Sequence, residues 1–162
     1  MKTKMSLNAL VVAGLMGASS LAVAGNSSLD LMYSNVTQKI EVGNVKAEAD
    51  QGGAAIQWRN QSRWLPFIGV VGSLNFAPKE GNVAMVGLMP NYDITDQLNV
   101  YGKIGASWSN AAGADDIHWG SWGVGAAYYF TERFGVVAEY NSLYDEKPYT
   151  MTSMDIGVSL RF

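Results

Sequence analysis

The stretch DIGVSLRF, residues 155–162, decides the fold class. Apolar side chains alternate along it with polar or small ones, the first set being Ile156, Val158, Leu160 and Phe162 and the second Asp155, Gly157, Ser159 and Arg161. A period of two indicates a strand with one apolar and one polar face. Such a strand fits either the edge of a soluble sandwich or the last strand of a closed barrel in lipid.

The N-terminus indicates export. Lys2 and Lys4 form a basic start, which is followed by a short run of apolar and small residues over 7–18. The sequence Ala-Val-Ala at 22–24 then fits an A-x-A cleavage site. The run is too short for a transmembrane helix, which needs roughly 20 residues. We therefore predict a cleavable signal peptide over residues 1–24 and one domain over residues 25–162; the alternative is an uncleaved amphipathic anchor.

The mature chain is acidic and has no cysteine. Of 11 basic and 14 acidic residues, removal of Lys2 and Lys4 leaves 9 and 14, a net charge of −5. Without a basic run this balance argues against nucleic acid as a partner. Because disulfides are excluded, a small exported domain needs another source of stability. Barrel closure in lipid, where every backbone donor and acceptor is paired, is one such source.

Eight segments of alternation, separated by turn signals, predict eight strands. They cover residues 28–35, 53–60, 67–76, 83–92, 98–108, 119–130, 134–142 and the stretch from about 151. The connections alternate between tight turns, at 93–97 and 131–133, and more open acidic loops, at 43–52, 110–116 and 145–148. Outer-membrane barrels have short periplasmic turns and longer outside loops. With an even strand number, both termini are then expected on the periplasmic side.

Aromatic residues favour the barrel over the sandwich. Several lie near the predicted strand ends, including Tyr92 and Phe130 on the turn side and Trp108, Trp119 and Tyr149 on the loop side. Two such girdles are typical of membrane barrels, whereas a sandwich would scatter its aromatics through the core. We predict an all-β fold, an eight-stranded antiparallel up-and-down transmembrane β-barrel.

Charged side chains of both signs fall on the predicted inner face. They are Asp30, Arg59, Lys103, Glu139, Asp155 and Arg161. Eight strands leave an interior that side chains fill. Since an unpaired buried charge costs several kcal/mol, three acids and three bases predict a salt-bridge network across the lumen. The alternative is six independent, solvated charges near the rims.

The chain resembles the OmpX, Ail and Lom group of small eight-stranded outer-membrane proteins over nearly its whole mature length. The matching stretches are GGAAIQWRN (52–60), IGVVGSLNF (68–76), VGLMPNYDITD (86–96), VYGKIGASW (100–108), SWGVGAAYYF (121–130) and DIGVSLRF. The resemblance implies a Gram-negative outer-membrane location, contact with membrane lipids and lipopolysaccharide, and a structural or surface-interaction role such as adhesion or envelope integrity. It also implies a terminal assembly signal, read by the barrel-assembly machinery: Val158, Leu160 and Phe162.

One departure from this group concerns the loops. Adhesive members carry tall outside loops, whereas the connection at 77–82 is short here. A short rim offers little surface to an extracellular protein partner, and the sequence does not identify one. The acidic outer rim, Glu48 and Asp50 included, could instead hold divalent cations shared with lipopolysaccharide; solvated loop charges are the alternative.

Two further functions stay open. A narrow channel would need a wet path past Arg59, Lys103 and Glu139, which eight-strand geometry disfavours. A lipid A-modifying enzyme would need a base and a nucleophile, for which His118 and Ser121 are the candidates. Positions three apart in a strand point to opposite faces, so these two should not meet unless a bulge intervenes. We expect no catalytic residue, no metal and no cofactor.

Overall fold

The computed structural model describes residues 26–61, 67–77, 81–109, 117–146 and 148–162, so the predicted signal peptide lies outside the described residues. The strands are β1 (Asn26–Val42), β2 (Val45–Gln61), β3 (Ile68–Ala77), β4 (Gly81–Asp93), β5 (Leu98–Ser109), β6 (Ile117–Tyr129), β7 (Phe134–Glu146) and β8 (Tyr149–Arg161). No helix among these residues is long and apolar enough to cross a membrane.

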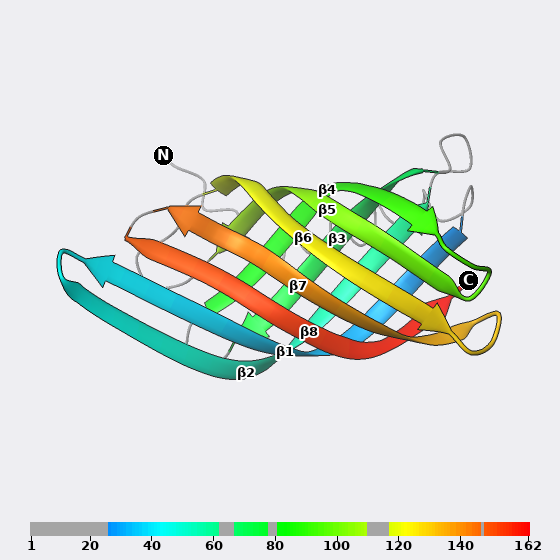
Figure 1. Cartoon of the computed structure of the whole chain (residues 1–162), viewed down its shortest axis with the longest axis horizontal. Coiled ribbons are helices and arrows are strands. Elements are labelled where there is room, and N and C mark those ends of the chain that lie inside the picture. Colours follow the sequence, from blue (N-terminus) through cyan, green and yellow to red (C-terminus); the bar gives the residue numbers. More distant parts are fainter. Residues whose placement is uncertain (1–25, 62–66, 78–80, 110–116, 147) are drawn as a thin grey trace, which may run out of the picture.

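The strands form a closed antiparallel barrel in chain order, which confirms the predicted fold (Figure 1). Closure comes from the pairing of β1 with β8, from Ser28 opposite Arg161 to Ile40 opposite Tyr149. At the seam the Ser27 amide donates to the Phe162 carbonyl at 3.1 Å, and the Phe162 amide donates to the Ser27 carbonyl at 2.9 Å. A closed wall leaves no unpaired strand edge facing lipid.

The barrel wall has an apolar outer face and a polar inner face. In β8, Met154, Ile156 and Val158 are exposed, whereas Ser153 and Asp155 are buried. The other strands repeat the pattern, with exposed outward residues that include Leu31, Val86, Leu88, Ile104, Val124 and Val136. The interior of this protein is therefore the polar compartment, as expected of a barrel in lipid and not of a soluble sandwich.

Short turns lie at the end of the barrel that holds the C-terminus. Thr95 and Thr131 each begin such a turn, and their hydroxyls accept hydrogen bonds from the amides of Leu98 at 3.0 Å and Phe134 at 2.9 Å. The Arg161 amide donates to the Arg133 carbonyl at 2.7 Å, so the β6–β7 turn lies beside the end of the chain. The tight turns predicted from the sequence are confirmed.

The first two strands are much longer than predicted, and the loop expected at 43–52 is wrong. β1 and β2 each have 17 residues and stay paired up to Val42 opposite Val45. Only Gly43 and Asn44 form the turn. Gly43 has φ of 60° while no described non-glycine residue has positive φ, as in a type II′ turn. Residues 37–52 thus form a ribbon that extends beyond the paired part of β3, here called the hairpin extension (Figure 1).

A bulge changes the outer half of β6. Gly120 has φ of 101°, and the β5–β6 register shifts between Gly105 and Ala106. Because a residue is inserted, His118 and Ser121 are both buried. The bulge is the exception named in the sequence analysis, and because of it these two residues do not point to opposite faces.

Candidate functional site

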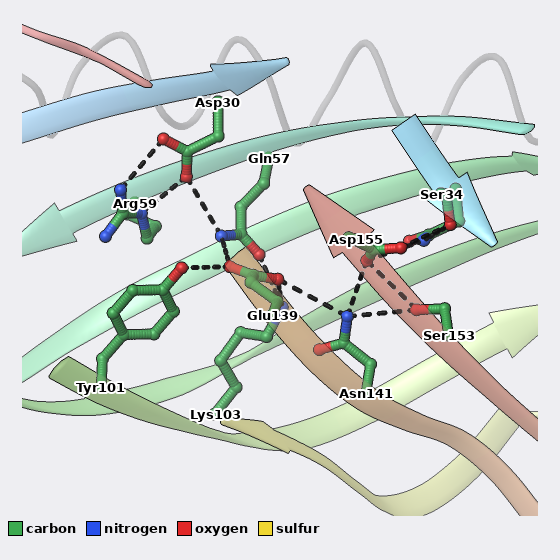
Figure 2. Close-up of polar contacts among 11 residues, drawn as sticks. Asp30, Ser34, Gln57, Arg59, Tyr101, Lys103, Glu139, Asn141, Ser153 and Asp155 are labelled. Atoms are coloured by element: carbon green, nitrogen blue, oxygen red, sulfur yellow. Dashed lines mark hydrogen bonds and ion pairs between the residues drawn. The ribbon is translucent and has the colours of Figure 1, made fainter. Parts of the chain in front are cut away.

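An ion pair between β5 and β7 occupies the middle of the lumen (Figure 2). Lys103 Nζ lies 2.5 Å from Glu139 Oε2 and donates to Gln57 Oε1 at 2.7 Å. The Gln57 amide and the Tyr101 hydroxyl both donate to Glu139 Oε1. These four side chains are at most 5% exposed. Each charge is thus fully surrounded by partners, which a buried ion pair requires.

A second ion pair joins the first two strands. Arg59 Nε donates to Asp30 Oδ2 at 2.6 Å, and its NH2 group donates to Asp30 Oδ1 at 3.0 Å, which makes the pair bidentate. Gln57 Nε2 also donates to Asp30 Oδ2 at 3.1 Å and so links the two ion pairs. The Arg59 guanidinium lies 4.5 Å from the centre of the Tyr101 ring. Four of the six charges expected in the lumen therefore form one connected cluster.

The structure differs from the expectation at Asp155, which has no ion-pair partner among the described residues. Its carboxylate accepts hydrogen bonds from Ser34 Oγ at 2.5 Å, Asn141 Nδ2 at 2.8 Å, Ser153 Oγ at 3.1 Å and Asn75 Nδ2 at 3.4 Å. In the strand register Asp155 stands opposite Glu139, whose own carboxylate holds Lys103. Neutral donors satisfy Asp155 in place of a cation.

Arg161 also differs from the expectation. Its guanidinium lies 3.6 Å from the centre of the Tyr129 ring, a cation–π contact, and no ion pair is formed within the described ranges. Tyr129 in turn hydrogen-bonds Ser159 at 3.0 Å and accepts from Arg59 NH2 at 3.2 Å. Arg161 is near the end of β8, so it covers the cluster at the end of the barrel that holds the C-terminus.

Glycines of β6 make room for this cluster. A Cβ on Gly125 would lie 2.7 Å from Tyr101 Cζ, and one on Gly123 would lie 2.3 Å from Asn141 Oδ1. Either contact is shorter than carbon atoms tolerate, so these positions require glycine while Tyr101 and Asn141 keep their places. The alternation of the sequence predicts that Gly123 and Gly125 face inward, but it does not indicate which side chains they accommodate.

An apolar layer closes the lumen on the side of the hairpin extension. Val36, Val83, Leu143 and Met151 are each at most 5% exposed and pack as one cluster. Val36 is the next inward-facing residue of β1 after Ser34, and Met151 is the inward-facing residue of β8 just before Ser153. The polar cluster is therefore covered by aliphatic side chains, and the middle of the barrel is solid.

Several members of the polar cluster were missed by sequence reasoning. Gln57, Tyr101, Asn141 and Ser34 lie on inward positions, but only charged residues had been counted as candidates. Their positions were predictable from the same alternation. Their partners were not, because the register between non-adjacent strands decides which inward side chains meet.

The inner residues considered for catalysis are held in structural contacts. Ser121 Oγ lies 2.9 Å from the Leu143 carbonyl oxygen and 2.7 Å from Ser107 Oγ, within hydrogen-bond distance of both. The His118 ring lies 4.9 Å from the Tyr144 ring. Within the described residues, no three His, Asp or Glu side chains are grouped so that they could hold a metal ion.

A different set of charges lies on the hairpin extension. Lys39 Nζ is 3.3 Å from Glu48 Oε2, Lys46 Nζ is 2.7 Å from Glu41 Oε1, and Thr37 Oγ1 donates to Asp50 at 2.6 Å. The four ion-paired side chains are exposed. The hydrogen bond to Glu41 and the charge of Glu41 raise the pKa of Lys46. Lysine and carboxylate thus alternate along an unburied surface.

Comparison with known proteins places the chain among outer-membrane barrels. Residues 9–162 match the model of the outer membrane protein beta-barrel domain, and the chain belongs to this family of Gram-negative outer-membrane proteins. The predicted resemblance is confirmed at this level. No curated protein sequence matches.

Solved structures share the fold. Ail, the attachment invasion locus protein of Yersinia pestis, crystallised with the heparin analogue sucrose octasulfate, has a TM-score of 0.63 at 19% identity and covers 86% of this chain and 99% of its own. OprG from Pseudomonas aeruginosa has a TM-score of 0.55 at 12% identity, covering 86% and 96%. The N-terminal barrel domain of Pseudomonas aeruginosa OprF gives 0.53 at 17%, covering 86% and 98%.

Proposed function

We propose that this protein is a non-conducting, non-enzymatic barrel that makes contacts at the outer-membrane surface through its hairpin extension. Its apolar outer wall is suited to lipid acyl chains, and its rim to the lipopolysaccharide around it. The termini are then periplasmic, because the short turns lie at their end of the barrel and the hairpin extension at the other. An attachment role is in line with the fold shared with Ail, named the attachment invasion locus protein.

The observation that carries this proposal is the solid lumen. Asp30, Gln57 and Lys103 are between 0% and 3% exposed, so water barely reaches them even though they are polar. A channel needs a continuous wet path past these residues. The apolar layer around Val36 and Leu143 adds a second obstruction along the same axis.

Single-channel recording in planar bilayers tests the proposal against the channel alternative. We expect the wild-type barrel to give no stable unitary current. A matched variant, Lys103→Ala with Glu139→Ala, removes both ends of the central ion pair and serves as the control for detecting leakage. Stable unitary currents from the folded wild type would overturn the proposal.

The assembly signal is a separate part of the proposal. Val158, Leu160 and Phe162 are exposed on the lipid-facing side of the last strand, where a recognising protein could reach them before the barrel closes. We expect deletion of Phe162 to reduce the folded fraction in the outer membrane, measured by heat-modifiable gel mobility. Full assembly of the deletion variant would remove this part of the proposal.

A further inference from the structure

The hairpin extension has one open backbone edge. β1 pairs with β8 up to Ile40 opposite Tyr149, so its outer side is covered for most of its length. β2, in contrast, pairs with β3 only from Ala54 opposite Phe76 onward. Among the described residues, the segment 45–53 therefore has a strand neighbour on the β1 side alone. Unpaired N–H and C=O groups on such an edge are a template for another strand.

The charges on this edge complement themselves. An antiparallel pair of two copies of β2, centred on Ala47, puts Lys46 of each copy opposite Glu48 of the other. Centred on Ala49, the same pair would instead set Glu48 opposite Asp50 twice. Opposite charges directly across an antiparallel pair are favourable and like charges unfavourable. Of these two registers the one centred on Ala47 is therefore favoured, and in it the edge is complementary to the same edge of a second copy.

The ion pairs already present extend this ladder. Lys39 holds Glu48 at 3.3 Å, and Glu41 holds Lys46 at 2.7 Å. In the paired state the charges would alternate across four strands, from Lys39 and Glu48 of one copy to Lys46 and Glu41 of the next. Lys46 and Glu48, the two residues that would pair between the copies, are thus already oriented by ion pairs within their own hairpin.

The direction of the strands decides how the two copies meet. Two barrels in one membrane have their β2 strands running toward the same side, so a rotation axis along the membrane normal cannot make them antiparallel. Copies in facing membranes have opposed strand directions, as the register requires. Six residues separate Ala47 from the barrel wall at Gly53 on each side, which allows a gap of at most about 40 Å at roughly 3.3 Å per residue.

We propose that this chain pairs with itself in trans, β2 edge to β2 edge, so that it joins two membranes that face each other. The inference deepens the surface-interaction role proposed above and rests on it. It names the partner, a second copy, and the segment, residues 44–50. An unrelated peptide strand is the competing occupant of the same edge.

Clustering of proteoliposomes that carry the purified full-length barrel tests this proposal. We expect wild-type vesicles to cluster, as measured by dynamic light scattering, and protein-free vesicles to remain dispersed. Glu48→Lys sets Lys46 against a lysine in the self-pair, and Lys46→Glu sets Glu48 against a glutamate. We expect each variant alone to lose clustering at least tenfold.

A mixture of the two variants is the decisive control. Vesicles with Lys46→Glu present two glutamates, vesicles with Glu48→Lys present two lysines, and the same register then pairs opposite charges at both positions. We expect the mixture to cluster when neither variant does so alone. Unaltered heat-modifiable mobility shows that both variants fold.

The inference is overturned if wild-type vesicles stay dispersed, or if the mixture stays dispersed while each variant is folded. Clustering that survives Glu48→Lys would also overturn it, and would assign the contact to another surface. The conductance measurement is independent of vesicle clustering. A conducting barrel would refute the proposed non-conducting role, whereas self-pairing would still be decided by the clustering results.

Discussion

The lumen cluster and the hairpin extension use the same residue types for opposite purposes. Both pair lysine or arginine with a carboxylate of another strand, at 2.5–2.6 Å in the lumen and 2.7–3.3 Å on the hairpin. In the lumen each charge is buried and surrounded by further donors, whereas on the hairpin it is exposed to water. Burial makes a missing partner costly, while exposure leaves the charge available to a new one.

The largest effect is expected for Lys103→Met, which removes one partner of the buried pair. Glu139 would keep its charge without a cation, and breaking a buried pair costs about 3–5 kcal/mol. Unfolding in urea, followed by tryptophan fluorescence in detergent micelles, measures this loss. The double variant with Glu139→Leu should recover most of it, since no unpaired charge remains. A single-variant cost below about 1 kcal/mol would show that the lumen pair behaves like a surface pair.

A smaller loss of stability is expected for Gly125→Ala, which keeps every charged residue of the lumen but disturbs the packing of Tyr101 beside them. The new methyl group would press on Tyr101, whose hydroxyl donates to Glu139. Overpacking of this kind costs about 1–3 kcal/mol. The temperature at which the heat-modifiable band shifts measures the loss. Gly72→Ala is the matched control, because a Cβ there meets nothing within 4 Å. Equal shifts for both variants would contradict the packing argument.

The smallest effect is expected for Lys39→Ala on the hairpin extension. Lys39 and Glu48 are about half exposed, and exposed ion pairs contribute about 0.2–1 kcal/mol. The same urea experiment should place this variant within about 1 kcal/mol of the wild type. A loss as large as that of Lys103→Met would mean that the hairpin extension is part of the folding core, and the contrast between the two regions would fail.

The barrel itself was predictable from the sequence because lipid imposes a strict rule on it. Toward the C-terminus of the chain every second side chain must be apolar, and residues 156, 158, 160 and 162 obey this without exception. The lumen charges followed from the same rule. Their partners did not, since Asp155 and Arg161 found neutral and aromatic neighbours through a three-dimensional register that no local pattern records.

The hairpin extension was missed because its residues do not show the alternation of apolar and polar side chains that marks the barrel wall. Outside the membrane neither face needs to be apolar, so Lys39, Glu41, Lys46 and Glu48 alternate with other residues and resemble a solvated loop. The one available signal was Gly43–Asn44, a dipeptide typical of two-residue hairpin turns. The bulge at Gly120 was likewise concealed, because a glycine inside a strand pattern marks a bulge only some of the time.

The bulge at Gly120 also has a consequence for the position of the barrel in the bilayer. It exposes two indole rings three residues apart, Trp119 and Trp122, on one side of the wall. Indoles prefer the headgroup level of a membrane. Two indole anchors on the β6 side would hold that side at a fixed depth. The barrel axis should therefore be tilted from the membrane normal by a defined angle. Quenching of tryptophan fluorescence by lipids brominated at successive depths would measure this tilt.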